Sequence, residues 1–189
     1  MINKLLIVGC GLIGSSILKK VCKKKIAKRI LVFEKSKKNQ RSLKRFKLKF
    51  KLIKKMDKKI SECDFIVICA PLSEYKKIFL ACNKYTKKNV LITDVGSAKR
   101  DTITKINRIK RKDINWISSH PIAGSEVSGP LNGNENLFVN KWSVIINQKN
   151  SQNKEMKKIL KFWKLLGSKT VSMDAVQHDK ILAITCLLY

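Results

Sequence analysis

The chain has 189 residues, of which 44% are hydrophobic, so it can bury the core of one ordinary domain or of one domain and the start of a second. Its 42 lysine and arginine residues outnumber 13 acidic residues, and the formal net charge of +29 would suit a nucleic-acid-binding protein. The lysines are, however, spread over almost every polar stretch without a stacking aromatic platform or a nucleic-acid motif, so we expect no specific nucleic-acid partner.

No apolar run approaches the roughly 20 residues of a membrane-spanning helix, and the first apolar segment is too short for a signal peptide. We therefore expect a cytoplasmic protein without a membrane partner. The six cysteines form no Cys-x-x-Cys pair and lie mostly among apolar residues, as buried thiols do in a reducing compartment. Neither disulfides nor a metal site is expected.

The first predicted strand is the apolar run 4–8, and its continuous hydrophobicity is typical of a strand covered on both faces in a parallel sheet. It leads directly into a G-x-G-x-x-G motif and an amphipathic helix. In this motif Gly9 permits a tight turn, Gly11 lets the backbone approach a pyrophosphate, and Gly14 allows the helix to pack on the strand. The residues predicted to contact a dinucleotide here are Gly9, Gly11, Leu12, Ile13 and Gly14.

A second strand over 29–33 ends at Glu34, about twenty residues after the last glycine of the motif. At this position a dinucleotide-binding fold places an acidic residue on the adenosine ribose hydroxyls, and we favour that contact over a solvated strand-end charge. Neighbouring lysines would tolerate a 2′-phosphate, so NAD is preferred and NADP stays possible. Residues 36–62 predict only a helix and a short strand near 50–53.

The third strand, 65–70, is fully apolar, ends in Ala70 and is stopped by Pro71. Such a turn at the carboxyl end of a parallel strand would lie beside the cofactor. A plain helix start with proline near its first turn explains the same residues equally well.

The next strand, 89–94, leads into a helix through Gly96 and Ser97. Ser97 is well placed as the N-cap of that helix, which is a sufficient structural reason for a serine. Both residues also lie at the carboxyl end of a strand, where open α/β sheets bind ligands. We therefore include Gly96 in the predicted cofactor site and Ser97 in the predicted catalytic site.

The short segment 116–119 predicts a further strand and ends at His120, one of only two histidines in the chain. Few other side chains can act as a base near neutral pH, so His120 is a candidate general base, although a backbone-bonded histidine is the plainer interpretation. The long glycine- and asparagine-containing loop that follows, to about residue 140, is typical of a functional or a disordered segment.

We expect the same sheet to resume at 142–146 and to end with a strand at 170–173. Ser151 is the predicted cap of the intervening helix and Gly167 its end. Asp174 begins a capping-box pattern for a final helix that runs into the last residues with an apolar side. That helix has the character of an element that lacks its packing partner.

Four segments, taken in order, resemble the prephenate/arogenate dehydrogenases of tyrosine biosynthesis. They are the glycine motif, Asp94-Val95-Gly96-Ser97-Ala98-Lys99, the stretch from His120 to Gly129, and His178-Asp179. The resemblance implies NAD(P)-dependent oxidative decarboxylation of prephenate or arogenate to 4-hydroxyphenylpyruvate or tyrosine. It also implies a Rossmann-type, doubly wound and mainly parallel α/β domain over 1–173, followed over 174–189 by the start of an all-helical dimerisation domain.

The same resemblance assigns roles within the site. His120 would accept the ring-hydroxyl proton as hydride leaves the ring carbon, and Ser97 would hydrogen-bond that hydroxyl or orient His120. For His178 a structural and a pocket-lining role both stay open. The residues expected to contact the substrate are Ser97, His120, Gly124, Ser125, Glu126 and His178.

The chain departs from the family pattern at 185–189, where a Ser-His-Leu-Pro-His segment is usual and the sequence stops. We expect a truncated enzyme that lacks the helical domain, with its dimer contacts and its arginine for the ring carboxylate. The family implies a homodimer, but dimerisation and activity of this chain alone stay open. The alternatives are another small-substrate dehydrogenase of the Rossmann type and a noncatalytic NAD-binding protein.

Overall fold

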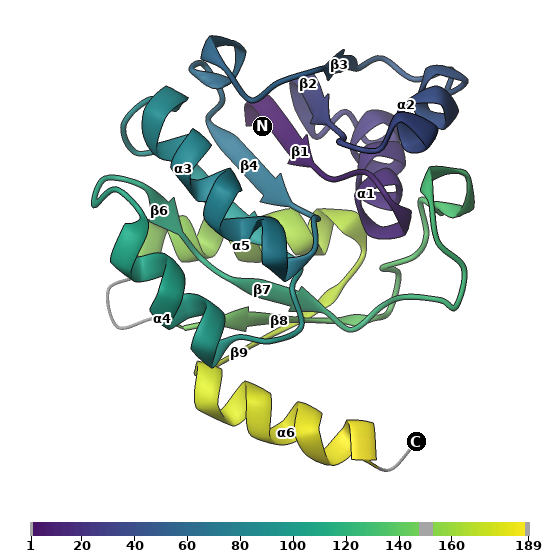
Figure 1. Ribbon diagram of the computed structural model, residues 1–189. Helices are drawn as coiled ribbons and strands as arrows, with labels where there is room; N and C mark the ends of the chain where they lie inside the picture. Colours follow the sequence, from purple (N-terminus) through teal and green to yellow (C-terminus); the bar gives the residue numbers. More distant parts are fainter. Residues whose placement is uncertain (1, 148–152, 188–189) are drawn as a thin grey trace.

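A computed structural model describes residues 2–147 and 153–187. Its centre is a six-stranded, all-parallel sheet with the strand order β3-β2-β1-β4-β5-β6 (Figure 1). The strands are β1 (Ile2–Val8), β2 (Ala27–Phe33), β3 (Lys51–Ile53), β4 (Phe65–Ile68), β5 (Leu91–Asp94) and β6 (Asn115–Trp116). The order reverses between β1 and β4, which is where open α/β sheets bind ligands. The predicted Rossmann-type class is confirmed.

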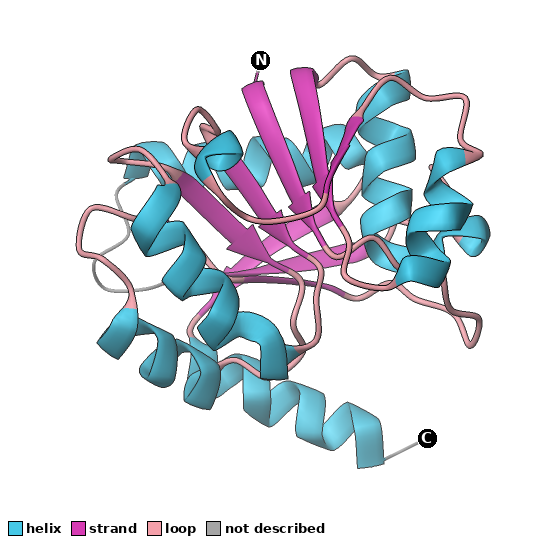
Figure 2. Ribbon diagram, turned by 45° about the horizontal axis from the view of Figure 1, so that its top comes forward, coloured by secondary structure: helices cyan, strands magenta, loops and turns pink. Residues whose placement is uncertain are grey.

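Helices cover both faces of this sheet (Figure 2). The helices of the described residues are α1 (Leu12–Lys23), α2 (Lys37–Lys44), α3 (Tyr75–Tyr85), α4 (Arg100–Ile109), α5 (Asn153–Leu166) and α6 (Ala175–Leu187), of which α6 packs against α4. The short 3₁₀ turns are η1 (Lys58–Ile60), η2 (Leu72–Glu74) and η3 (Pro130–Asn132). Ile17 of α1 and Trp163 of α5 are fully buried on one face, and Phe79 of α3 and Ile106 of α4 are buried on the other.

This layering explains the continuous apolar run of β1. Leu5 and Ile7 belong to the core under α1 and α5, whereas Leu6 and Val8 belong to the core under α3 and α4. All four side chains are at most 1% exposed. Since burying such a side chain stabilises the fold by about 1.5–3 kcal/mol, a strand between two helical layers must be apolar at every position. The prediction of a strand covered on both faces is confirmed.

Three strands that we expected to extend the main sheet form a separate sheet instead, so that part of the prediction is wrong. They are β7 (Ser119–Pro121), β8 (Trp142–Ile146) and β9 (Lys169–Met173), with β7 antiparallel and β9 parallel to the central β8. The predicted single strand at 116–119 is divided between β6 and β7. The physical reason is a buried polar junction, because the Ser119 hydroxyl donates to the Asp94 carbonyl oxygen at 2.7 Å and accepts from the Trp163 indole at 3.0 Å.

The helices of the second half begin and end largely as predicted. Gly167, with φ +103°, follows the last residue of α5, as predicted. Ser151, the predicted N-cap of α5, lies outside the described residues. Two backbone N–H groups in the first turn of α6 donate to the Asp174 carboxylate at 2.8 and 2.9 Å. Along α6 the side chains of Ile181 and Ile184 are 46% and 60% exposed. No helix in the described ranges is long and apolar enough to cross a bilayer.

Candidate active site

The glycine motif forms the turn between β1 and α1. Gly9 has φ +84°, and a Cβ there would lie 2.8 Å from the Cys69 carbonyl oxygen. A Cβ at Gly14 would lie 2.1 Å from the Gly9 carbonyl oxygen, so neither position accepts a side chain without a backbone shift. A Cβ at Gly11 would meet nothing within 4 Å. A side chain is therefore excluded at Gly9 and Gly14, whereas the space around Gly11 is open.

The N-terminus of α1 has the properties of an anion site. Its N-cap residue Gly11 supplies no side-chain acceptor, and no acidic residue lies in the first turn, which includes Leu12, Ile13 and Gly14. Backbone N–H groups and the helix dipole at such an end favour a negatively charged group. Together with the open position at Gly11, this arrangement fits the pyrophosphate of a dinucleotide.

Glu34 follows β2 and connects that strand to the glycine loop. It is only 7% exposed, and its two carboxylate oxygens accept hydrogen bonds from the backbone N–H of Cys10 at 2.7 Å and of Ser36 at 2.8 Å. The neighbouring Lys35 points its ammonium to Glu74 at 3.2 Å. Sequence reasoning placed Glu34 at this edge but missed that the carboxylate also holds the loop.

Ala70 and Pro71 lie beside the glycine loop at the end of β4. The Cys69 N–H donates to the Val8 carbonyl oxygen at 2.7 Å, and a Cβ at Gly9 would come within 2.9 Å of the Ala70 nitrogen. Pro71 is also the residue before η2, which continues into α3. Ala70 and Pro71 thus lie beside the glycine loop and at a helix start, and their contact with a cofactor stays a prediction.

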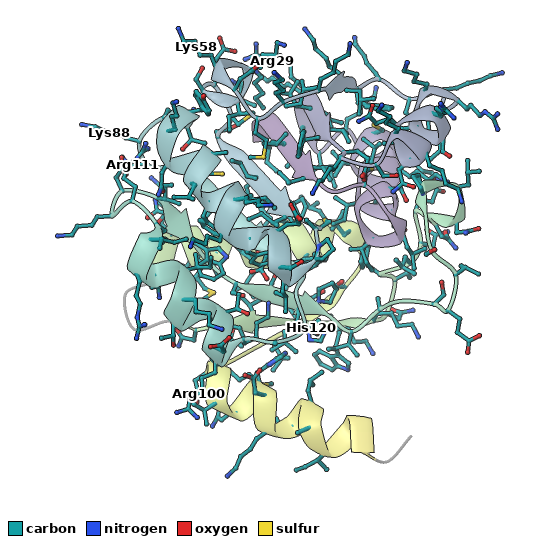
Figure 3. The ribbon with its side chains drawn as sticks, in the orientation of Figure 1. Arg29, Lys58, Lys88, Arg100, Arg111 and His120 are labelled. Carbon is teal, nitrogen blue, oxygen red and sulfur yellow. The ribbon has the colours of Figure 1, made fainter. Side chains whose placement is uncertain are left out.

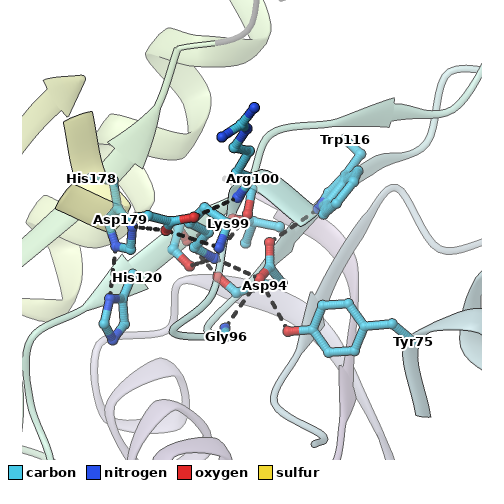
Figure 4. Close-up of polar contacts among 12 residues, drawn as sticks. Tyr75, Asp94, Gly96, Lys99, Arg100, Trp116, His120, His178 and Asp179 are labelled. Atoms are coloured by element: carbon cyan, nitrogen blue, oxygen red, sulfur yellow. Dashed lines mark hydrogen bonds and ion pairs between the residues drawn. The ribbon is translucent and has the colours of Figure 1, made fainter. Parts of the chain in front are cut away.

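A buried lysine, which sequence reasoning did not single out, lies beneath this edge. The Lys99 ammonium donates to the Asp94 carboxylate, to the Ser118 hydroxyl and to the Ser119 carbonyl oxygen, each at 2.8 Å (Figure 4). Lys99 and Asp94 are both 0% exposed. Burial lowers the pKa of Lys99, while the Asp94 carboxylate opposes that shift. The ion pair joins the carboxyl end of β5 to the start of β7.

Asp94 also accepts hydrogen bonds from neutral donors. They are the Tyr75 hydroxyl at 3.0 Å, the Gly96 N–H at 3.1 Å and the Trp116 indole at 3.1 Å. A buried carboxylate with so many partners is compatible with the fold because nearly every lone pair is used. The available signal was an acidic residue directly at the end of an otherwise apolar strand.

Gly96 and Ser97 are placed differently from one another. A Cβ at Gly96 would lie 2.5 Å from a Leu72 methyl and 2.8 Å from the Tyr75 hydroxyl, so a larger residue would have to displace the ends of these two side chains. Ser97 is exposed and does not cap a helix, because α4 begins at Arg100 and its N-cap residue is Lys99. The N-cap prediction for Ser97 is wrong, and its catalytic role stays a prediction.

His120 and His178 are brought together from β7 and α6. His120 Nδ1 lies 3.0 Å from His178 Nε2, and the two rings pack edge to face with centroids 5.2 Å apart (Figure 4). His178 is fully buried, whereas His120 is half-buried. Burial, followed by the charge of Lys99, lowers the pKa of His120 to about 4. His120 is therefore neutral at physiological pH, the form in which an imidazole accepts a proton.

Asp179 connects the histidines to the start of α4. Its Oδ1 lies 2.7 Å from His178 Nδ1 and accepts from the Lys99 N–H at 3.1 Å, while its Oδ2 accepts from the Arg100 N–H at 2.9 Å. The partial burial of Asp179 would raise its pKa, but the bonds from Arg100 and His178 outweigh it and the pKa is lowered. The acceptor at the start of α4 is thus a residue about 80 positions away rather than Ser97.

The loop after β7 has two parts. Gly124, Ser125 and Glu126, predicted to contact substrate, are exposed and, within the described residues, form no hydrogen bond to the histidines. The later part packs on α1, where the Asn134 N–H donates to the Ser16 hydroxyl at 2.9 Å. Phe138, near its end, is fully buried. The first part of the loop is therefore exposed directly after β7, whereas the later part is anchored on α1.

Charge and metal chemistry can be placed relative to this site. Among the basic residues labelled in Figure 3, Arg29 and Lys58 lie at the end of the molecule away from His120 and α6, whereas Arg100 lies beside α6. Across the described ranges, no group of three His, Cys, Asp or Glu side chains could hold a metal ion. The candidate site therefore consists of the neutral imidazole of His120 and the glycine turn after β1, which is suited to an anion.

Comparisons with known proteins agree on one family. A family model described as the nucleotide-binding domain of prephenate dehydrogenase matches residues 17–172. A prephenate dehydrogenase of Lactococcus lactis subsp. cremoris is 30% identical over 181 residues, which are 95% of this chain and 49% of that protein. A cyclohexadienyl dehydrogenase of Zymomonas mobilis is 29% identical over 126 residues, 67% of this chain and 43% of that protein. The chain spans about half the length of the curated relatives it matches.

Solved structures show the same fold. A prephenate dehydrogenase from Aquifex aeolicus superposes with a TM-score of 0.86 and 22% identity, covering 96% of this chain and 65% of that chain. The same kind of enzyme from that organism was solved with hydroxyphenyl propionate and NAD⁺, and it matches with a TM-score of 0.85, at 22% identity over 96% of this chain and 63% of that chain. An arogenate dehydrogenase from Synechocystis matches with a TM-score of 0.83 and 20% identity over 95% of this chain and 63% of that chain.

Proposed function

The chain belongs to the prephenate dehydrogenase family, and on that premise we propose that it carries the dinucleotide site and the base for the NAD-dependent oxidative decarboxylation of prephenate or arogenate. Residues 1–173 are the proposed dinucleotide-binding domain, and 174–189 the start of a helical substrate and dimerisation domain. The observation that carries the proposal is the neutral, half-buried His120 in β7, whose neighbour Ser119 is hydrogen-bonded to Asp94 at the carboxyl end of β5, together with the open glycine motif that follows β1.

The proposed cofactor contacts come from three strand ends. The glycine loop and the N-terminus of α1 hold the pyrophosphate, and Glu34 accepts hydrogen bonds from the adenosine ribose with lone pairs that its backbone partners leave unused. The Glu34 carboxylate disfavours a 2′-phosphate, which supports NAD over NADP. Ala70, Pro71 and Gly96 line the side toward β4 and β5. When bound, the nicotinamide supplies the acceptor for a hydride from the substrate.

The chemistry left to the protein is the removal of one proton. His120 takes the proton of the ring hydroxyl, and the O–H electron pair forms the ring ketone as hydride leaves the same carbon. Carbon dioxide is then lost from the quaternary carbon at the opposite (para) position of the ring, its bonding electrons pass through the ring to the ketone oxygen, and that oxygen takes a proton as the aromatic phenol forms. Ser97 is proposed to hydrogen-bond the hydroxyl, and Gly124, Ser125 and Glu126 to border the substrate.

The test measures reduced nicotinamide after NAD⁺ is mixed with prephenate or arogenate and the chain, alone and fused to the C-terminal half of the Lactococcus lactis relative. We expect His120→Gln to lower kcat by about 10²–10⁴-fold, since that is the usual contribution of a general base. NAD⁺ affinity by titration calorimetry should stay unchanged. An equally fast His120→Gln enzyme contradicts the assignment of the base.

NAD⁺ binding by calorimetry and turnover of each substrate together distinguish the alternative functions that the sequence left open. A noncatalytic dinucleotide-binding protein would bind NAD⁺ and turn over neither substrate in either form. Another dehydrogenase of the Rossmann type would reduce NAD⁺ with a hydroxy acid and not with a cyclohexadiene. Turnover of both cyclohexadienes with different kcat/KM values would assign the preference between prephenate and arogenate.

A further inference from the structure

A continuous series of hydrogen bonds runs from the start of α4 to His120, and its first members have fixed directions. The backbone N–H groups of Lys99 and Arg100 can only donate, and the ionised Asp179 carboxylate can only accept. His178 Nδ1, which lies 2.7 Å from the same carboxylate, must therefore carry a hydrogen. The donor and acceptor roles are therefore fixed as far as His178 Nδ1, before the hydrogen bonds reach His120.

The direction continues through the second contact. When His178 carries its single hydrogen on Nδ1, it presents an unprotonated Nε2, and this nitrogen lies 3.0 Å from His120 Nδ1. Only a hydrogen on His120 Nδ1 satisfies that contact. The neutral His120 ring then has its lone pair on Nε2.

We infer that His178 and Asp179 are positioning residues that hold His120 in the Nδ1–H tautomer and thereby make Nε2 the proton-accepting atom. The inference deepens the proposed function and rests on it only for the use made of Nε2, because the tautomer itself is a property of the chain without substrate. It also resolves the two roles that the sequence left open for His178. His178 acts through His120 rather than on the substrate.

A purely structural role for Asp179 makes a different prediction. Asp179 accepts hydrogen bonds at the start of α4, so its loss could act by loosening the contact between α4 and α6. A loosened helix would lower stability without dictating which nitrogen of His120 carries the hydrogen. The position of that hydrogen is therefore the measurement that distinguishes the two roles.

The chain is suited to this measurement because it contains only two histidines. In ¹⁵N-labelled chain at neutral pH, long-range ¹H–¹⁵N spectra distinguish protonated from unprotonated ring nitrogens. His178→Asn leaves His120 as the single imidazole and assigns the signals. We expect the unmodified chain to show hydrogen on Nδ1 of both histidines.

Asp179→Asn is the decisive variant. Its amide keeps one acceptor oxygen and replaces the other by an NH₂, so the side chain at 179 no longer fixes the hydrogen on His178 Nδ1. We expect the His120 hydrogen to lose its preference for Nδ1 in this variant and in His178→Asn. The control is Asp101→Asn, which removes one negative charge from the first turn of α4, where Asp101 is 70% exposed and pairs with Lys105. The control should leave both rings unchanged.

Kinetics then connect the tautomer to the reaction. In a preparation that turns over, Asp179→Asn should lower kcat by about 10²–10⁴-fold with little change in KM, as wrong-tautomer variants of hydrogen-bonded histidines do. A hydrogen on Nε2 of His120 in the unmodified chain overturns the inference. The inference is also overturned if the hydrogen stays on Nδ1 of His120 in both Asp179→Asn and His178→Asn. The His178→Asn result decides the question even if Asp179→Asn does not fold. Absence of turnover would count against the proposed function and leave the tautomer result intact.

Discussion

The two halves of the candidate site are built in contrasting ways. The glycine loop is one contiguous turn in which Gly9 and Gly14 fit closely against atoms at the ends of β1 and β4. The histidine cluster, His120, His178 and Asp179, joins side chains 58 positions apart and depends on the direction of hydrogen bonds. Steric fit tolerates few side chains but sets no donor or acceptor role on its partners. Hydrogen-bond direction requires every distant partner to be present.

The largest expected effect lies beneath the histidine cluster. Lys99→Met leaves the Asp94 carboxylate buried without its cation, and removing one partner of such a pair costs about 3–5 kcal/mol. Urea unfolding should show this loss in the free energy of unfolding. The matched control is Lys105→Met on the same helix, whose exposed pair with Asp101 contributes about 0.5 kcal/mol or less. Equal losses for the two variants would contradict a supporting role for Lys99.

The glycine loop offers a contrast within itself. Gly14→Ala places a Cβ against the Gly9 carbonyl oxygen and should lower the free energy of unfolding by about 1–3 kcal/mol. Gly11→Ala meets open space, so stability should change by less than about 1 kcal/mol while NAD⁺ affinity falls. Thermal unfolding and titration calorimetry measure the two quantities. If Gly11→Ala binds NAD⁺ as well as the unmodified chain, the pyrophosphate does not approach the loop there.

Glu34 tests whether the glycine loop also depends on hydrogen-bond direction. Glu34→Gln replaces one acceptor oxygen by an NH₂ that faces a backbone N–H, so we expect a loss of about 1–2 kcal/mol and several-fold weaker NAD⁺ binding. NADP⁺ binding should weaken less. Glu74→Gln, which removes only the pair with Lys35, serves as the control. A weakening of NAD⁺ and NADP⁺ to the same extent would argue against the ribose contact.

The histidine cluster is also expected to make stability depend on pH. The pKa of His120 falls from an ordinary 6.5 to about 4, chiefly because of burial, so below pH 6.5 the unfolded chain binds a proton that the folded chain does not. The contribution of neutral His120 to stability is complete above pH 6.5 and is lost as pH falls toward 4. The difference in unfolding free energy between the unmodified chain and His120→Gln should shrink over that window. A constant difference would mean that His120 titrates normally in the folded chain.

Several features of the fold can be predicted from the sequence, because they depend on interactions between residues that are close together in the chain. The apolar run of β1 requires cover on both faces, and the spacing of Gly9, Gly11 and Gly14 follows from a turn into a helix. The start of α6 at Asp174 is equally local, since the carboxylate binds N–H groups two and three residues ahead. The family resemblance added the pairing of His120 with a dinucleotide fold, which neither composition nor periodicity indicates.

The sequence by itself determined the parallel sheet, the glycine turn and the candidate base, because hydrophobic periodicity and backbone sterics act between near neighbours. Tertiary structure alone decided that β7, β8 and β9 leave the main sheet, that Asp179 rather than Ser97 serves the start of α4, and that Lys99 and Asp94 pair in the interior. It also decided which nitrogen of His120 faces His178. These features depend on directional hydrogen bonds and buried charges between distant segments, and such contacts exist only once the chain has folded.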